Sequence, residues 1–318
     1  MPDRFAKYAW IVVAYNLLVI VWGAFVRATG SGSGCGKHWP LCNGEIVQRS
    51  PTLATIIELT HRASSGIAGL MVLGLFIWAF TALPRRHPAR SGAAVALLLT
   101  NTEALIGASL VLLEHVAKDQ SLARVGYLSV HLVNTFFLIA ALTLTAWWAG
   151  GAPRFRMSGR SALAAAATIF VGVSGAVTAL GDTLFPAASL AQGFREDLAP
   201  SAHFLIRFRA LHPFFAVAVA CYLVWFAWSV RERSRFAAPL IGVVIAQLAL
   251  GAINIALLAP VWMQLAHLLL ADVLWILVIL VCGAGTPAYH LENHRETSVT
   301  GVTGDLHYGN RNAAPRPN

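Results

Sequence analysis

The sequence predicts an all-α membrane protein with eight transmembrane helices, arranged as two pseudo-symmetric four-helix bundles. Of the 318 residues, 57% are hydrophobic and only 12% are charged, a composition typical of a polytopic membrane protein. The apolar residues form eight stretches, each long enough to cross a bilayer, which takes about 20 residues. Short sequence patterns also recur between the two halves of the chain, which indicates an internal repeat.

The eight predicted spans cover residues 8–27, 53–82, 91–113, 125–149, 161–180, 201–230, 238–258 and 262–283. The second and the sixth are long enough to tilt in the bilayer or to project beyond it. The first is expected to be a retained helix, because no small-residue cleavage site follows its apolar stretch. The polar tail after the last span is rich in Gly, Asn and Pro and is expected to be disordered.

Positive charges predict the orientation of the spans. They gather before the first span, after the second, fourth and sixth, and in the tail. These residues are Arg4, Lys7, Arg85, Arg86, Arg90, Arg154, Arg156, Arg160, Arg231, Arg233, Arg235, Arg295, Arg311 and Arg316. With eight spans they all fall on one face, which is cytoplasmic by the positive-inside rule, as are both termini. The net charge of +9 is therefore mostly a topology signal, and no soluble basic face is expected for nucleic acid.

The two halves share short patterns at matching positions. The matches are Glu103-Ala-Leu-Ile-Gly107-Ala with Gln247-Leu-Ala-Leu-Gly251-Ala, and Gly23-Ala24 with Gly175-Ala176. Four spans per copy insert both copies in the same orientation, so the pseudo-two-fold axis is expected along the membrane normal. We divide the chain into a bundle at 1–152, which includes the outer loop 28–52, a second bundle at 153–286, and the tail 287–318.

One histidine lies early in each even-numbered span, on the order of 10 Å below the outer end of its helix. The four are His61, His131, His212 and His267. Ionisable residues at membrane depth are costly and mark functional sites, and neutral imidazole is a common iron ligand. Each alone could be a hydrogen-bonded packing residue. Four at one depth, two per bundle, instead predict two bis-histidine heme sites in the outer half of the membrane.

Glu58 precedes His61 by three residues on the same helical face, about 4.5 Å nearer the outside. It either takes part in catalysis at the edge of a heme, or it orients the histidine and contacts water at the membrane interface. The matching position before His212 holds Arg209, so the carboxylate belongs to the first half alone. This asymmetry indicates chemistry in the first bundle and electron storage in the second.

Four arginines near the outer ends of the spans are candidate contacts for anionic heme propionates. They are Arg27, Arg62, Arg207 and Arg209. Snorkelling to lipid headgroups is the alternative for each of them. Two further intramembrane acids, Glu103 and Asp272, have no role assigned from the sequence.

The outer loop 28–52 carries Cys35 and Cys42 on the side of the membrane where disulfides form. Its glycines and Pro40 allow a turn tight enough to bring the two sulfurs together. The pair is either a structural staple or part of a lid over the site below, with redox-active thiols. With His38 between the cysteines a metal site is a further alternative, although a closed zinc site would need a fourth ligand.

With these residues in view, the chain closely resembles the heme A synthase family. The resemblance covers all eight spans and leaves out only the tail. Its most specific carriers are Gly23-Ala-Phe-Val-Arg27-Ala-Thr-Gly30-Ser-Gly, the stretch from Cys35 that ends in Trp39-Pro40-Leu41-Cys42-Asn43-Gly44, Glu58-x-x-His61-Arg62, and the single histidines His131, His212 and His267.

The resemblance implies a substrate site for heme O in the first bundle and a heme b cofactor in the second. Their iron ligands would be His61 with His131, and His212 with His267, respectively. It further implies oxidation of a porphyrin methyl group to a formyl group through successive hydroxylations, with Glu58 at the reacting edge. Cys35 and Cys42 would form the loop disulfide. Residues 181–200 contain no cysteine, so the second outer cysteine pair of some relatives is missing here.

The resulting hypothesis is a heme A synthase in a bacterial cytoplasmic membrane that serves terminal oxidase assembly. Heme O would enter sideways from the membrane lipid because of its long isoprenoid tail. Methyl-to-formyl oxidation removes four electrons, which requires an acceptor such as a quinone. Heme O synthase and oxidase assembly factors are the expected protein partners.

A non-catalytic di-heme b-type cytochrome that relays electrons to or from quinone is the rival hypothesis. A relay across the membrane would place its hemes near opposite faces, whereas these histidines lie at one depth, which favours the enzyme. A transporter built from repeats would leave the pattern of iron ligands unexplained.

Overall fold

The computed structural model describes residues 2–46, 48–152 and 157–284, and the predicted tail 287–318 lies outside this part. The helices are α1 (Pro2–Ala28), the short η1 (Ser31–Ser33), α2 (Leu53–Ala82), α3 (Pro88–Leu112), α4 (Leu122–Ala149), α5 (Gly159–Leu184), α6 (Leu190–Asp197), α7 (Phe204–Ser229), α8 (Ala237–Ala256) and α9 (Val261–Ala284). Within the described ranges, eight helices are long and apolar enough to cross a membrane. The predicted all-α membrane fold with eight spans is therefore confirmed.

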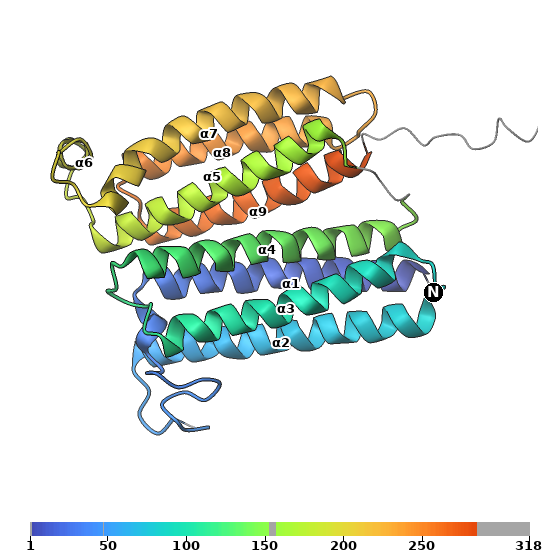
Figure 1. The fold of residues 1–318 in the computed structure, drawn as a ribbon, viewed down its shortest axis with the longest axis horizontal. Coiled ribbons are helices and arrows are strands. Elements are labelled where there is room, and N and C mark those ends of the chain that lie inside the picture. The colour runs from blue at the N-terminus through green and yellow to red at the C-terminus, as the bar shows by residue number, and fades with distance from the viewer. Residues whose placement is uncertain (1, 47, 153–156, 285–318) are drawn as a thin grey trace, which may run out of the picture. The chain divides into compact units, whose positions relative to one another are not determined.

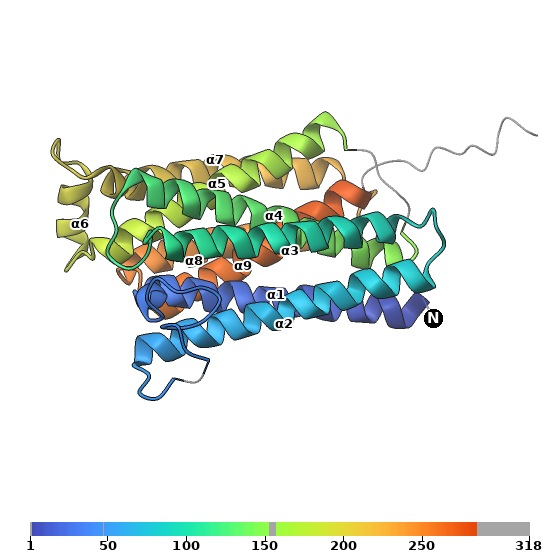
Figure 2. The same ribbon diagram turned by 60° about the horizontal axis from the view of Figure 1, so that its bottom comes forward.

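The sequence did not predict α6, a short helix in the outer loop between α5 and α7. The hydroxyl of Ser189 caps its first turn by accepting a hydrogen bond from the Gln192 amide at 3.2 Å. At eight residues the segment is too short to show a helical period clearly among polar loop residues. The outer loop after α1 and this helix lie at the same end of the long helices (Figure 2).

The long helices form two groups within the compact unit Met1–Thr286. α1, α2, α3 and α4 pack on one another, as do α5, α7, α8 and α9 (Figure 1). α1 and α4 of the first group pack against α5 and α9 of the second. The two bundles therefore share one continuous interface along the length of the spans.

Side-chain caps set the start of three of the four helices that carry a membrane histidine. Thr52, Ser121 and His203 accept hydrogen bonds from the backbone amides of α2, α4 and α7. These caps satisfy amide groups that have no partner inside the helix. His61, His131 and His212 then follow nine or ten residues after their caps, which gives them a common depth below the helix ends.

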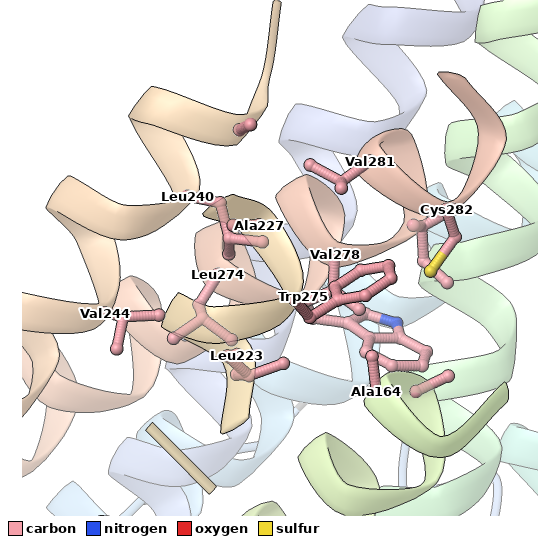
Figure 3. Packing of buried hydrophobic residues seen from close by; sticks show 14 of the residues in the cluster. Ala164, Leu223, Ala227, Leu240, Val244, Leu274, Trp275, Val278, Val281 and Cys282 are labelled. Carbon is pink, nitrogen blue, oxygen red and sulfur yellow. The ribbon is translucent and has the colours of Figure 1, made fainter. Parts of the chain in front are cut away.

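Trp275 of α9 is the largest fully buried side chain and lies at the interface between the bundles. Its indole Nε1 donates a hydrogen bond to the Phe136 carbonyl of α4 at 2.7 Å, and the two rings meet edge to face. Around it pack small and branched side chains of the second bundle, including Ala164 and Val278 (Figure 3). A buried indole N–H needs such an acceptor, so this contact fixes the register of α9 against α4.

Replacing Trp275 by Phe removes the indole N–H and keeps an aromatic ring. We expect the free energy of unfolding to fall by about 1 kcal/mol, the usual net contribution of one hydrogen bond. Trp262→Phe is the matched control, because Trp262 lies in the same helix and is 62% exposed. Equilibrium unfolding in mixed detergent micelles measures both, and equal stabilities would contradict this assignment.

Candidate functional site

Each membrane histidine lies against a glycine of a neighbouring long helix. The pairs are Gly23 with His61, Gly107 with His131, Gly175 with His212, and Gly251 with His267. A methyl group on these glycines would lie 2.9, 3.6, 3.0 and 3.2 Å, respectively, from the Cε1 atom of the imidazole. The first, third and fourth distances are too short for an unstrained contact, so at these positions glycine leaves the room that the ring occupies.

The histidines are neighbours in the predicted pairs. His61 and His131 lie close enough for their charges to interact, and so do His212 and His267. Within the described residues, the Nδ1 atoms of His61 and His267 are buried and have no hydrogen-bond partner, and His131 Nδ1 lies 3.2 Å from the Glu103 carboxylate. His212 Nδ1 instead lies 2.8 Å from the Ser174 hydroxyl.

Unpartnered ring nitrogens at membrane depth are unfavourable unless a ligand uses the imidazole. In the described ranges, no three His, Cys, Asp or Glu side chains lie close enough together to hold a metal ion by themselves. The candidate iron ligands are therefore the two histidines of each bundle. Two neighbouring imidazoles in each bundle fit a heme iron that is held by two histidines. His61 with His131 would hold one such group, and His212 with His267 the other.

Cys35 and Cys42 form a disulfide bond, as predicted, and both are fully buried. The bond occupies both sulfurs, so the alternative of a metal site at these cysteines is wrong. Gly34 packs directly on the first turn of α2, where a methyl group would come within 2.4 Å of the Ala54 carbonyl group. The Thr55 hydroxyl donates to the Gly34 carbonyl at 2.8 Å, which ties the loop to the start of α2.

Glu58 is 3% exposed and connects α2 to the disulfide loop. One carboxylate oxygen accepts from the Cys35 amide at 2.8 Å, and the other pairs with Arg62 at 2.5 Å. The Arg62 guanidinium also donates to the carbonyls of His38 and Leu41 at 2.7 and 2.9 Å. We call Glu58, Arg62 and these loop groups the loop clamp. It holds the disulfide loop against the first turns of α2.

Arg27 of α1 reaches across to the second bundle. Its guanidinium donates to the Ala179 carbonyl and the Thr183 hydroxyl of α5 at 2.8 and 3.0 Å, and to the Gln264 amide oxygen of α9 at 3.0 Å. The sequence predicted that Arg27 contacts either a heme propionate or a lipid headgroup. In the structure these donors link the two bundles.

Arg209 links α6 to the first turns of α7. It pairs with Asp197 at 2.7 Å, with Glu196 at 3.5 Å and with Asp182 at 3.7 Å. Arg207 donates to the Pro200 carbonyl at 2.7 Å. All four candidate arginines therefore have acceptors within the protein. Their positions in the sequence do not predict these acceptors, because an arginine side chain can reach several alternatives.

The matches to known proteins cover most of the chain. A family model described as a cytochrome oxidase assembly protein, COX15-CtaA, matches residues 6–279. The chain belongs to the COX15-CtaA family. The resemblance found in its motifs is thereby confirmed. As a member of this family with eight long apolar helices, the chain is a multi-pass membrane protein.

Two kinds of relative stand out. A Thermus thermophilus protein named Protoheme IX farnesyltransferase is 50% identical over 289 residues, which covers 87% of this chain and 48% of that protein. The chain thus spans about half the length of this relative. Proteins named Heme A synthase are 40% identical over 111 residues in Alkalihalophilus pseudofirmus and 41% over 110 residues in Bacillus mycoides. These two matches cover 35% and 34% of this chain and 37% and 35% of the relatives.

The glycine contacts predict a specific loss of heme binding. Gly23→Ala places a methyl group 2.9 Å from the His61 ring, so we expect the ring to move and the heme content of the purified protein to fall severalfold. Gly66→Ala is the control, because a methyl group at Gly66 in the same bundle meets no atom within 4 Å. Heme per chain, measured from pyridine hemochrome absorbance, should separate the two variants. Equal heme contents would mean that the glycine contact does not serve a heme ligand.

The loop clamp predicts how the disulfide responds to reductant. Arg62→Gln removes the ion pair with Glu58 and weakens the hold on the loop. We expect a membrane-impermeant phosphine to reduce the Cys35–Cys42 bond at least about tenfold faster, a change of roughly 1.4 kcal/mol in the free energy of opening. Lys37→Gln is the control, because it breaks only an exposed pair with Glu114 in the same region. Mass analysis after alkylation follows the reaction, and identical reduction rates would rule out the clamp.

Proposed function

We propose that this chain is a heme A synthase, an oxidoreductase that converts a porphyrin methyl group of heme O to a formyl group. The single observation that carries the proposal is the set of four glycine–histidine contacts, two in each bundle. Membership in a family of cytochrome oxidase assembly proteins and the relatives named Heme A synthase support it. The product would serve the assembly of terminal oxidases.

The proposed division of labour puts heme O between His61 and His131, and the heme b cofactor between His212 and His267. Two features of the first bundle support it as the place of chemistry. The disulfide loop lies over this bundle, and the buried Glu58 carboxylate has no acidic counterpart at Arg209. The domain limits 1–152 and 153–286 are part of this proposal.

The residues of the first bundle bind the substrate, orient it and limit its contact with water. His61 and His131 hold the ring system from two helices, and the disulfide loop covers the outer end. The donors Cys35 N–H and Arg62 fix the Glu58 carboxylate in one orientation. From there Glu58 acts as a base or as an electrostatic stabiliser at the methyl carbon.

Four electrons and four protons are released when a methyl group and one water molecule become a formyl group. Heme b, when bound, supplies one-electron transfer away from the substrate site. His212 and His267 hold it in place, and the Ser174 hydroxyl, 2.8 Å from His212 Nδ1, orients that ring. A quinone is the proposed external acceptor.

The proposed orientation puts both termini in the cytoplasm of a bacterium and both heme sites toward the outer face. Arg27, Arg62, Arg207 and Arg209 stay candidate propionate contacts. In the described part of the chain, Arg207 donates the fewest hydrogen bonds to protein acceptors among them, which favours it for this role.

The Thermus relative bears on the proposed partner. Its name, Protoheme IX farnesyltransferase, describes a protein about twice as long as the part that this chain matches. About half of that relative is 50% identical in sequence to this chain, and the whole relative is named as a farnesyltransferase. This supports a heme farnesyltransferase as the enzyme that supplies the substrate. Heme O synthase and oxidase assembly factors are thus the proposed protein partners.

The decisive experiment is extraction and chromatography of the hemes from the purified protein. We expect heme b together with heme O or heme A. Two heme b groups per chain, with neither of the other hemes, would favour the non-catalytic di-heme cytochrome.

Variants test the division of labour and the role of Glu58. Glu58→Gln should retain heme and lose at least 90% of heme A production, because the carboxylate charge is removed at nearly constant shape. Glu114→Gln, at a side chain that is 59% exposed, should leave production unchanged. His212→Ala should lower heme b, whereas His61→Ala should leave most heme b in place. Equal loss of heme b in both histidine variants would contradict two separate sites.

A further inference from the structure

An intramembrane glutamate lies beside one of the proposed heme ligands. Glu103 of α3 lies one helical turn from Gly107, the glycine that packs on His131. Its Oε1 atom is 3.2 Å from His131 Nδ1, and its side chain is 21% exposed. Within the described residues, no hydrogen bond with good alignment satisfies this Nδ1 atom. The Glu103 carboxylate is therefore the acceptor within reach of the ring.

The next turn of α4 supplies donors to this carboxylate. Asn134 Nδ2 donates to Oε2 of Glu103, and the Thr135 hydroxyl donates to Oε1. Asn134 is held in turn, because its Nδ2 donates to the Leu99 carbonyl at 2.9 Å and its Oδ1 accepts from Thr102 at 2.7 Å. A carboxylate at membrane depth is costly unless it is paired in this way. The network therefore holds an acidic group beside His131.

The second bundle has a neutral counterpart. Gln247, four residues before Gly251, places its Nε2 atom 3.2 Å from both the Nε2 atom and the carbonyl oxygen of His267. The residues three and four positions after His267 are Leu270 and Ala271, which have no polar side chain. The Glu103 carboxylate and its two donors thus lie beside His131. The Gln247 amide lies beside His267, where the matching donors are absent.

We propose that Glu103 is a positioning residue for His131 that accepts a hydrogen bond from its Nδ1–H group. This bond selects the tautomer that leaves Nε2 for iron, fixes the ring plane and increases electron donation by the imidazole. A ligand that donates more strongly lowers the reduction potential of its heme. The heme in the first bundle is therefore easier to oxidise than it would be with a neutral partner at this position. The inference rests on the proposed role of His131 as an iron ligand.

The variant Glu103→Gln tests the inference, because it installs the side chain that the second bundle has at this position. We expect the midpoint potential of the heme bound through His131 to shift to a more positive value. The affinity of this site for added heme b should fall about 10- to 100-fold, as is usual when a partner of a ligating histidine is lost. The measurements are redox titration of the purified full chain and rebinding of heme b followed by absorbance.

A charge control and a reference variant complete the design. Glu232→Gln makes the same change of charge at a side chain that is 85% exposed, and should change neither quantity. The difference between wild type and His131→Ala identifies which signal belongs to the first bundle.

The outcomes separate this inference from the proposed function. If His131→Ala leaves the heme content and spectrum of the protein unchanged, the ligand assignment fails, and with it the proposed substrate site. If His131→Ala removes a heme signal but Glu103→Gln leaves the potential and the affinity at wild-type values, only the role of Glu103 is overturned. An equal shift in Glu232→Gln would assign the effect to net charge and would also overturn it.

Discussion

The contact between an imidazole and the backbone of a neighbouring helix is the constraint on which the rest of this structure depends. In lipid, helices gain little from burying apolar surface against one another, so close packing at small residues does much of the work of association. The chain uses glycine at four such places and fills each with a histidine ring. A polar ring is thereby held at membrane depth in a narrow slot, where its orientation is determined by the helix pair.

The two bundles use this scaffold differently. The first adds groups that are absent from the matching positions of the second, namely the Glu58 carboxylate with its disulfide loop and the Glu103 carboxylate with its donors. The second has Arg209, which anchors α6, and the neutral Gln247. The glycine–histidine contacts are thus repeated in both bundles, whereas the polar groups around the histidines differ. Such an arrangement suits two sites that perform different chemistry. The common part positions the four histidines, and the differing part sets their charge environment.

Much of this architecture could be predicted from the sequence, because hydrophobic length and charge bias are properties of each span by itself. The eight spans followed from such local signals, whereas the pairing of Cys35 with Cys42 was implied by the resemblance of the loop to a known family. The contacts of Gly23 and Gly251 could not be derived in the same way. Both glycines were visible as part of a repeat, but which face of a helix meets the next helix depends on packing.

The arginines show the same limit more clearly. Arg27 and Arg209 were expected to meet propionates or headgroups, on the basis of their charge and depth. In the structure they pair with carbonyl, amide and carboxylate groups of distant segments. A long side chain with five donors can satisfy itself in many ways, so sequence position alone does not select its partner. The short α6 was missed for a related reason, because its place depends on the anchor that Arg209 supplies.

Under the proposed function, the link from Arg27 to α5 and α9 bears on how fast electrons pass between the two bundles. Tunnelling through protein slows steeply as the gap between donor and acceptor widens, so a small sliding motion of one bundle along the other would change the rate greatly. Arg27 near the outer ends and Trp275 within the shared interface oppose such sliding at two separate levels. The spacing of the two sites then becomes a fixed property of the fold, independent of movements of the outer loops.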